Sequence, residues 1–193
     1  ILEIKWRLIQ PMKLPGPAQM LMLAADPHYR LLLGRIFDRF QKDYPVYEPL
    51  PTASLPDDMV SQVVQHRFRA AKDDWPLVQV GPGVFTVNDT QHYTWTDFEQ
   101  RAKVAVTRLY EAHPAVSELN IESLVLRYID AVEYNYEQEN SFEFLRDKLK
   151  VGISPPTSLF QDTGVGSRPK TFSWQATFPC TKPSGSVHIS FAT

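Results

Sequence analysis

The stretch Leu77-Val78-Gln79-Val80-Gly81-Pro82-Gly83-Val84-Phe85-Thr86-Val87 predicts the second arm of a β-hairpin whose first arm is formed by residues 66–70. This arm is rich in Val and Phe, which favour strands, and Gly81-Pro82-Gly83 interrupts it. Proline lacks a backbone donor and glycine tolerates a positive φ, so we expect a bulge or tight turn there. A phosphate-binding loop is the weaker alternative, because the Gly-x-x-x-x-Gly-Lys pattern is missing and no helix follows at once.

On the N-terminal side, two further strands and a helix are predicted. Residues 1–8 alternate between apolar and polar side chains, with Leu2, Ile4 and Trp6 on one side, as in a half-buried strand. Asp26-Pro27 has the form of a helix N-cap followed by proline, so a helix is predicted from there to about Lys42. Residues 66–70 alternate again and predict the next strand.

On the C-terminal side, a helix and a long strand follow. Thr94 with Asp97 three residues later has the spacing of a capping box, and His113-Pro114 is expected to end the helix that begins there. Residues 121–136 are rich in Ile, Leu, Val and Tyr and predict one long strand. A short helix is predicted at residues 141–149.

Two strands complete the chain. Residues 171–178 alternate cleanly, and the apolar set is Phe172, Trp174, Ala176 and Phe178. We expect Phe172 and Trp174 to be buried on the same sheet face as Trp6. The last strand carries Val187, Ile189 and Phe191 on one face.

These elements predict an α+β fold with a mainly antiparallel sheet and helices on one face, because the helices are too few to cover both faces of a parallel sheet. The first six elements have the strand-helix-strand-strand-helix-strand order of a ferredoxin-like unit. A length of 193 residues is that of one domain, and we expect residues 1–193 to form a single one from which residues are missing at both ends.

Composition excludes several classes of function. The formal net charge of -2 makes nucleic acid an unlikely partner, and no apolar run is long enough for a membrane span. The single cysteine, Cys180, fits a reducing compartment such as the cytoplasm. The five histidines show no metal-binding spacing, so neither a metal nor another cofactor is predicted.

The first candidate ligand-binding residues are Asn88 and Asp89, which join the predicted hairpin to the following helix. Such junctions place polar side chains beside the unpaired N–H groups of a helix start, where an anion or a hydroxyl-rich ligand can bind. The alternative is that both residues form an Asx turn and cap the helix.

Arg127, Tyr128 and Asp130 are the other candidates, because they lie within the predicted long strand. A charged residue there must leave the buried face or find a partner, and we expect Arg127 to be partly buried beside an acidic residue such as Glu133. A structural ion pair is favoured over an anion site. Arg67 and Arg69 share one strand face, but without aromatic residues between them they support a nucleic-acid surface only weakly.

The hairpin segment, together with Tyr93-Thr94-Trp95, Phe98 and Leu126-Arg127-Tyr128-Ile129-Asp130, resembles a sporadically distributed family of uncharacterised bacterial and archaeal proteins. Glu3-Ile4-Lys5-Trp6 is similar to the first strand of that family. Members usually carry Asn at the position of Asp130, and they are longer, with a further helix after the last strand. The resemblance implies a soluble cytoplasmic protein and assigns no activity or catalytic residue.

Two hypotheses about function follow. The first is a non-catalytic binding or protein-interaction module, because no nucleophile, metal or cofactor motif is present. The second is an enzyme with a polar pocket formed by Asn88, Asp89, Arg127 and Asp130, to which Tyr128 and Glu133 could contribute. A homodimer is also predicted, because the apolar final strand would template aggregation if its edge stayed open.

Overall fold

The computed structural model describes residues 1–9, 26–56, 59–90, 93–135 and 137–192. The chain divides into two compact units, Ile1–Ile129 and Asp130–Thr193, and each is considered by itself. The single α+β domain expected over residues 1–193 stays a prediction.

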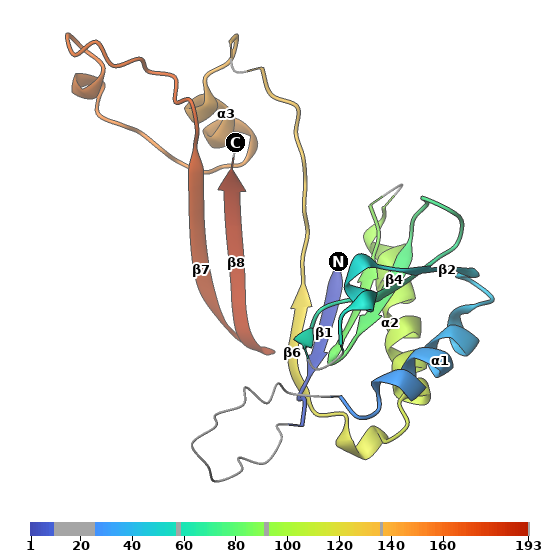
Figure 1. The fold of residues 1–193 in the computed structure, drawn as a ribbon. Coiled ribbons are helices and arrows are strands. Elements are labelled where there is room, and N and C mark those ends of the chain that lie inside the picture. The colour runs from blue at the N-terminus through green and yellow to red at the C-terminus, as the bar shows by residue number, and fades with distance from the viewer. Residues whose placement is uncertain (10–25, 57–58, 91–92, 136, 193) are drawn as a thin grey trace, which may run out of the picture. The chain divides into compact units, whose positions relative to one another are not determined.

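The described part of the first unit is an antiparallel sheet with two helices (Figure 1). The strands are β1 (Leu2–Trp6), β2 (Val46–Pro49), β3 (His66–Arg69), β4 (Leu77–Gly81), β5 (Val84–Asn88) and β6 (Ile121–Leu126). They follow the order β2-β3-β4-β5-β1-β6, and every neighbouring pair is antiparallel. The helices are α1 (Tyr29–Phe40) and α2 (Trp95–Ala112), and the 3-10 turns are η1 (Pro51–Ser54) and η3 (Val116–Glu118).

This architecture confirms the α+β class and the mainly antiparallel sheet. Strands β2 and β3 lie beyond β4, so the six-strand order does not confirm the finer ferredoxin-like prediction. Within the described residues, no helix has the length and apolar composition that crossing a bilayer requires.

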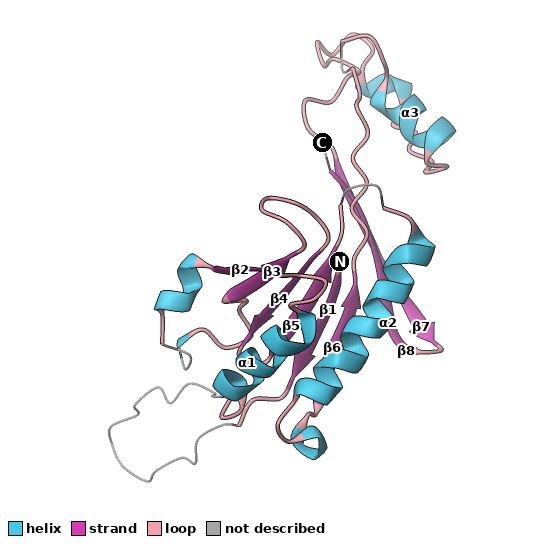
Figure 2. Cartoon of the chain, turned by 90° about the vertical axis from the view of Figure 1, so that its right-hand side faces the viewer, coloured by secondary structure: helices cyan, strands magenta, loops and turns pink. Residues whose placement is uncertain are grey.

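Both helices of the first unit pack on the same face of the sheet, and the core lies between them and the strands (Figure 2). The sheet supplies alternate residues of its central strands, and the helices supply one stripe each, as helical periodicity requires. The buried core residues include Leu2, Ile4, Trp6, Val78, Val80, Phe85 and Val87 from the sheet, and Leu32, Ile36, Phe40, Phe98, Ala105 and Leu109 from the helices.

The predicted signals at the helix ends act as expected for α2. The Thr94 hydroxyl accepts the backbone N–H of Asp97 at 3.3 Å, and His113 follows the last residue of the helix. Helix α1 begins three residues after Asp26 rather than at Pro27, because the Asp26 carboxylate accepts the backbone N–H of His28 at 3.0 Å in a preceding turn.

Residues 77–87, predicted as one hairpin arm, form two strands, β4 and β5, which pair with each other, so that prediction is wrong. Gly81-Pro82-Gly83 makes the tight turn between them. Gly83 has a φ of +74°, which L side chains adopt only at a cost, so its backbone role is confirmed. Gly81 is needed for a different reason, because a Cβ atom there would lie 1.9 Å from the carbonyl oxygen of Val63.

Strand β6 is much shorter than predicted. It ends at Leu126, and residues 127–135 lie outside any strand and are exposed except for the half-buried Tyr134, while Tyr136 lies outside the described residues. The prediction of one strand over residues 121–136 is therefore wrong. A segment becomes a strand only where a neighbour can pair with it, and composition alone does not show where the neighbour ends.

The second unit contains α3 (Ser141–Lys148), the 3-10 turn η4 (Thr157–Leu159), and the strands β7 (Ser173–Thr181) and β8 (Ser184–Ala192). The two strands form a separate two-stranded sheet. The expected burial of Phe172 and Trp174 on the sheet face of Trp6 is therefore wrong. Trp174 pairs with Phe191 in this hairpin, and the centroid of the Phe172 ring lies 6.1 Å from that of Phe142. The alternation itself is confirmed, since Trp174 is half-buried and Gln175 is exposed.

Candidate functional site

Asn88, the first predicted site residue, belongs to a polar network on the sheet. Its side-chain amide donates to the Gln79 Oε1 at 3.1 Å and to the Thr86 Oγ1 at 2.8 Å. Because Thr94 caps helix α2, Asn88 does not serve as its cap. These bonds fix the Asn88 side chain between neighbouring strands.

Asp89 lies beside Arg101 and near the amino group of Ile1. Its side chain is only 4% exposed, and its Oδ2 lies 3.6 Å from the Arg101 Nη2. Leu2 pairs with Val87 on one side and with Leu126 on the other, so Asp89 and Arg127 lie on the two sides of the start of β1.

Arg127 does not have the predicted environment. Its side chain is exposed, and its backbone donates to and accepts from Ile1, both at 2.8 Å. The expected partial burial beside Glu133 is wrong, because the strand that would have buried Arg127 ends one residue earlier.

Tyr128 and Asp130 follow Arg127 along the same exposed segment. The Tyr128 ring packs against Trp95 at 5.9 Å and Tyr93 at 6.4 Å, beside the start of α2. Asp130 is exposed and begins the second unit. None of the five predicted residues lines either of the two cavities described below.

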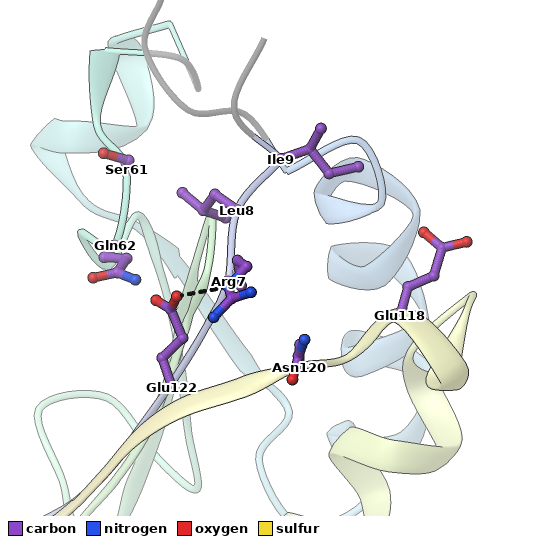
Figure 3. A pocket seen from close by; sticks show the side chains of 8 residues that line it. All are labelled: Arg7, Leu8, Ile9, Ser61, Gln62, Glu118, Asn120 and Glu122. Carbon is purple, nitrogen blue, oxygen red and sulfur yellow. Dashed lines mark hydrogen bonds and ion pairs between the residues drawn. The ribbon is translucent and has the colours of Figure 1, made fainter. Parts of the chain in front are cut away.

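An open cavity of about 650 Å³ lies where β1 ends (Figure 3). It is lined by Arg7, Leu8, Ile9, Ser61, Gln62, Glu118, Asn120 and Glu122. These residues come from the end of β1, the segment before β3, and the chain from η3 into β6. Cavities of a few hundred to a thousand Å³ are the size that holds small molecules.

An irregularity in the sheet places Arg7 in this cavity. The register of β1 against β6 shifts between Lys5 and Trp6, and such bulges turn a side chain to a new direction. Beyond the shift, the Arg7 backbone N–H donates to the Asn120 carbonyl at 2.8 Å. The Arg7 Nε donates to the Glu122 Oε1 at 3.0 Å, as Figure 3 shows.

Gln62 lines the opposite wall in a left-handed backbone conformation, with a φ of 57°. Its backbone N–H donates to the Pro82 carbonyl at 2.7 Å, and its side-chain amide donates to the Trp6 carbonyl at 3.4 Å. These bonds hold a conformation that costs a non-glycine residue about 1 kcal/mol or more.

A second, smaller cavity shares Arg7, Ile9 and Glu118 with the first and adds two histidines. The His28 Nε2 lies 3.0 Å from the Glu118 Oε2, and the His28 and His113 rings are 5.5 Å apart. His113 is buried, and burial lowers its pKa. Because its Nδ1 accepts the Ala115 N–H at 3.2 Å, the neutral ring carries its proton on Nε2.

The two cavities therefore bring polar groups together. They are the guanidinium of Arg7, the carboxylates of Glu118 and Glu122, the amides of Gln62 and Asn120, and the imidazoles of His28 and His113. Sequence reasoning missed this set because its members come from four distant segments with no motif spacing. The only local signal is the position of His28 beside the helix-start residues Asp26-Pro27. Among the described residues, no three His, Cys, Asp or Glu side chains gather in a way that could hold a metal ion.

Arg67 and Arg69 are not a free basic stripe. Both pair with Glu48 of the neighbouring strand, with N–O distances of 3.5 Å for Arg67 and 3.0 Å for Arg69. Arg69 also donates to the Asp74 carbonyl at 2.7 Å. Because these ion pairs neutralise most of their charge, Arg67 and Arg69 offer little positive charge to the phosphate backbone of a nucleic acid.

The β7–β8 hairpin presents an apolar face. The pairs Trp174–Phe191, Ala176–Ile189 and Phe178–Val187 stand opposite one another, and Cys180 pairs with Gly185. Phe178 and Val187 are each 49% exposed, and Ile189 is 39% exposed. The alternate residues, such as Thr177 and His188, are polar, so the ribbon is amphipathic.

Comparison of the chain with protein-family models, with curated proteins and with solved structures found no match.

Proposed function

We propose that this protein is a non-catalytic interaction module that self-associates through the apolar face of the β7–β8 hairpin. This apolar hairpin face consists of Trp174, Ala176, Phe178, Cys180, Val187, Ile189 and Phe191. The observation that carries the proposal is the exposure of Phe178, Val187 and Ile189 on one side of a two-stranded ribbon.

The apolar face of such a ribbon is stable only if another surface packs on it and shields it from water. An isolated two-stranded hairpin is marginally stable in water, and exposed apolar patches usually mark interaction surfaces. A second copy offers a matching surface, since two sheets pack face to face about 10 Å apart with interdigitating side chains. Closed two-fold dimers are also the commonest assembly of soluble proteins.

Two neighbouring residues on β8 allow a matched test. Ile189 lies on the apolar hairpin face, and His188 lies on the polar face of the same strand. We expect sedimentation to give a dimer for the unmodified chain and for His188→Lys, and a monomer for Ile189→Lys. A monomer mass for the unmodified chain at micromolar concentration would refute self-association, and an Ile189→Lys dimer would place the contact elsewhere.

An enzyme is the alternative proposal. The four residues expected to form its pocket do not line a described cavity, whereas His28 and Glu118 do. A carboxylate that orients an imidazole is a common arrangement for a general base, and this pair is the observation that supports catalysis. Conversion of a small molecule that binds in the cavity, followed by NMR, would favour the enzyme, and binding without conversion would favour the module.

The finer expectations remain proposals as well. They are a cytoplasmic location, a ferredoxin-like order of the elements in the first part of the chain, and membership of the uncharacterised prokaryotic family.

A further inference from the structure

We propose that the open cavity of Figure 3 binds a small zwitterion of the α-amino acid type. Arg7 would hold the carboxylate of this ligand and Glu118 its ammonium group. The proposal uses residues of the first unit only and does not depend on self-association through the hairpin.

The charges that line the cavity favour a ligand with both signs. Among the described residues that line the cavity, Arg7 is the one guanidinium, and Glu118 and Glu122 are carboxylates. Arg7 would repel a simple cation, and the two carboxylates would repel a simple anion. A zwitterion can satisfy both kinds of group at once.

Arg7 is able to accept a carboxylate. Its bond to Glu122 uses Nε, and no other side-chain bond of Arg7 occurs among the described residues. The Arg7 side chain is 67% exposed, so the Nη groups can reach a ligand. Guanidinium groups bind carboxylates through paired N–H donors, which gives both strength and orientation.

Glu118 is positioned for the ammonium group. Its Oε2 is held by the His28 Nε2 at 3.0 Å, which limits the orientations of the carboxylate. The Glu118 side chain is still 58% exposed, so a ligand can approach it. A carboxylate held in place loses less side-chain entropy when it binds a cation than a free one does.

The other lining residues suit the remainder of an amino acid. Asn120 and Gln62 can hydrogen-bond to polar atoms, and Ser61 adds a hydroxyl. Leu8 and Ile9 supply the apolar part of the lining, and Ile9, 57% exposed, offers a surface against which an aliphatic side chain can pack. L-leucine is therefore a suitable probe.

The test is a titration of the full chain with L-leucine, followed by calorimetry and by NMR of the protein. Isoamylamine lacks the carboxylate of leucine and isocaproate lacks the ammonium group, so we expect each to bind at least about tenfold more weakly. Arg7→Gln and Glu118→Gln should each weaken leucine binding by a similar factor. The exposed residues Arg35 and Glu143 supply matched controls, and Arg35→Gln and Glu143→Gln should leave the affinity unchanged.

Three results would overturn the proposal. They are the absence of leucine binding up to about 10 mM, equal affinity for leucine and both single-charge analogues, and unchanged affinity in Arg7→Gln and Glu118→Gln. Circular dichroism of each variant shows whether it is folded, so that a loss of binding is not caused by unfolding. Repeating the titration with Ile189→Lys separates this result from the test of self-association.

Discussion

The Asp26 carboxylate holds the indole of Trp6, whose Nε1–H donates to the Asp26 Oδ2 at 3.1 Å. The same oxygen accepts the backbone N–H of Gly83 at 3.2 Å, and the Oδ1 accepts the N–H of His28. One side chain thus joins β1, the β4–β5 turn and the start of α1. Since Trp6 is 2% exposed, its indole N–H has no access to water as a substitute partner.

We therefore expect Asp26→Ala to lower the free energy of unfolding by about 2–4 kcal/mol, because it removes charged hydrogen bonds and leaves a buried indole donor unpaired. Asp26→Asn keeps an acceptor for Trp6 and should cost less. Urea denaturation of both variants measures the difference. Equal and small losses would show that the carboxylate does not join these elements.

The two turn glycines should differ in their tolerance of a methyl group. Gly83→Ala should cost about 1–2 kcal/mol, because it forces an L residue to positive φ and brings its Cβ within 2.6 Å of the Leu8 Cδ2, a flexible side chain. Gly81→Ala should cost more, since the Val63 carbonyl it would meet is backbone. Gly185→Ala has open space around its Cβ and serves as the control, with a change of about 0.5 kcal/mol or less. Thermal unfolding measures these losses, and a loss in Gly81→Ala as small as that in Gly185→Ala would contradict this explanation.

His113 should make stability depend on pH. Burial lowers the pKa of His113 in the folded protein, so the unfolded chain binds a proton at this ring at pH values where the folded protein does not. The resulting stability is present above the unfolded pKa of about 6.5 and is lost as pH falls below it. His113→Asn keeps an acceptor for the Ala115 N–H but cannot be protonated.

Urea denaturation at about pH 7.5 and about pH 5.5 tests this prediction. Between these values, the unmodified chain should lose more free energy of unfolding than His113→Asn does. The charged neighbours Asp26, His28 and Glu118 are present in both proteins, so the difference between the two losses reports on His113 itself. The same loss in both would mean that His113 is not the group responsible.

Local patterns in the sequence predicted the local structure well. The alternation of Leu2, Ile4 and Trp6 and the Thr94–Asp97 cap depend on neighbours along the chain, and both occur as expected. The alternation around Trp174 is also present, but the sheet to which that strand belongs was assigned wrongly. An amphipathic strand has an apolar side whichever neighbour it pairs with, so its sequence does not select its sheet.

The cavity could not be predicted for the same reason. Arg7 reaches it through a register shift that depends on how β1 pairs with β6, and Glu118 meets His28 across 90 positions of sequence. The predicted candidates were chosen from a junction and from a strand that proved shorter. Arg127 was expected to need a partner only because that strand was taken to continue past it.

The most direct test of the proposed interaction module uses Cys180, the only cysteine of the chain, which lies on the apolar hairpin face. Its thiol is half-buried, so a second copy packed on that face should shield it further. We predict that the rate constant for its reaction with an excess of a maleimide reagent falls several-fold as protein concentration rises from low to high micromolar, and that Ile189→Lys abolishes this fall. A rate constant independent of concentration in the unmodified chain would contradict self-association through the hairpin.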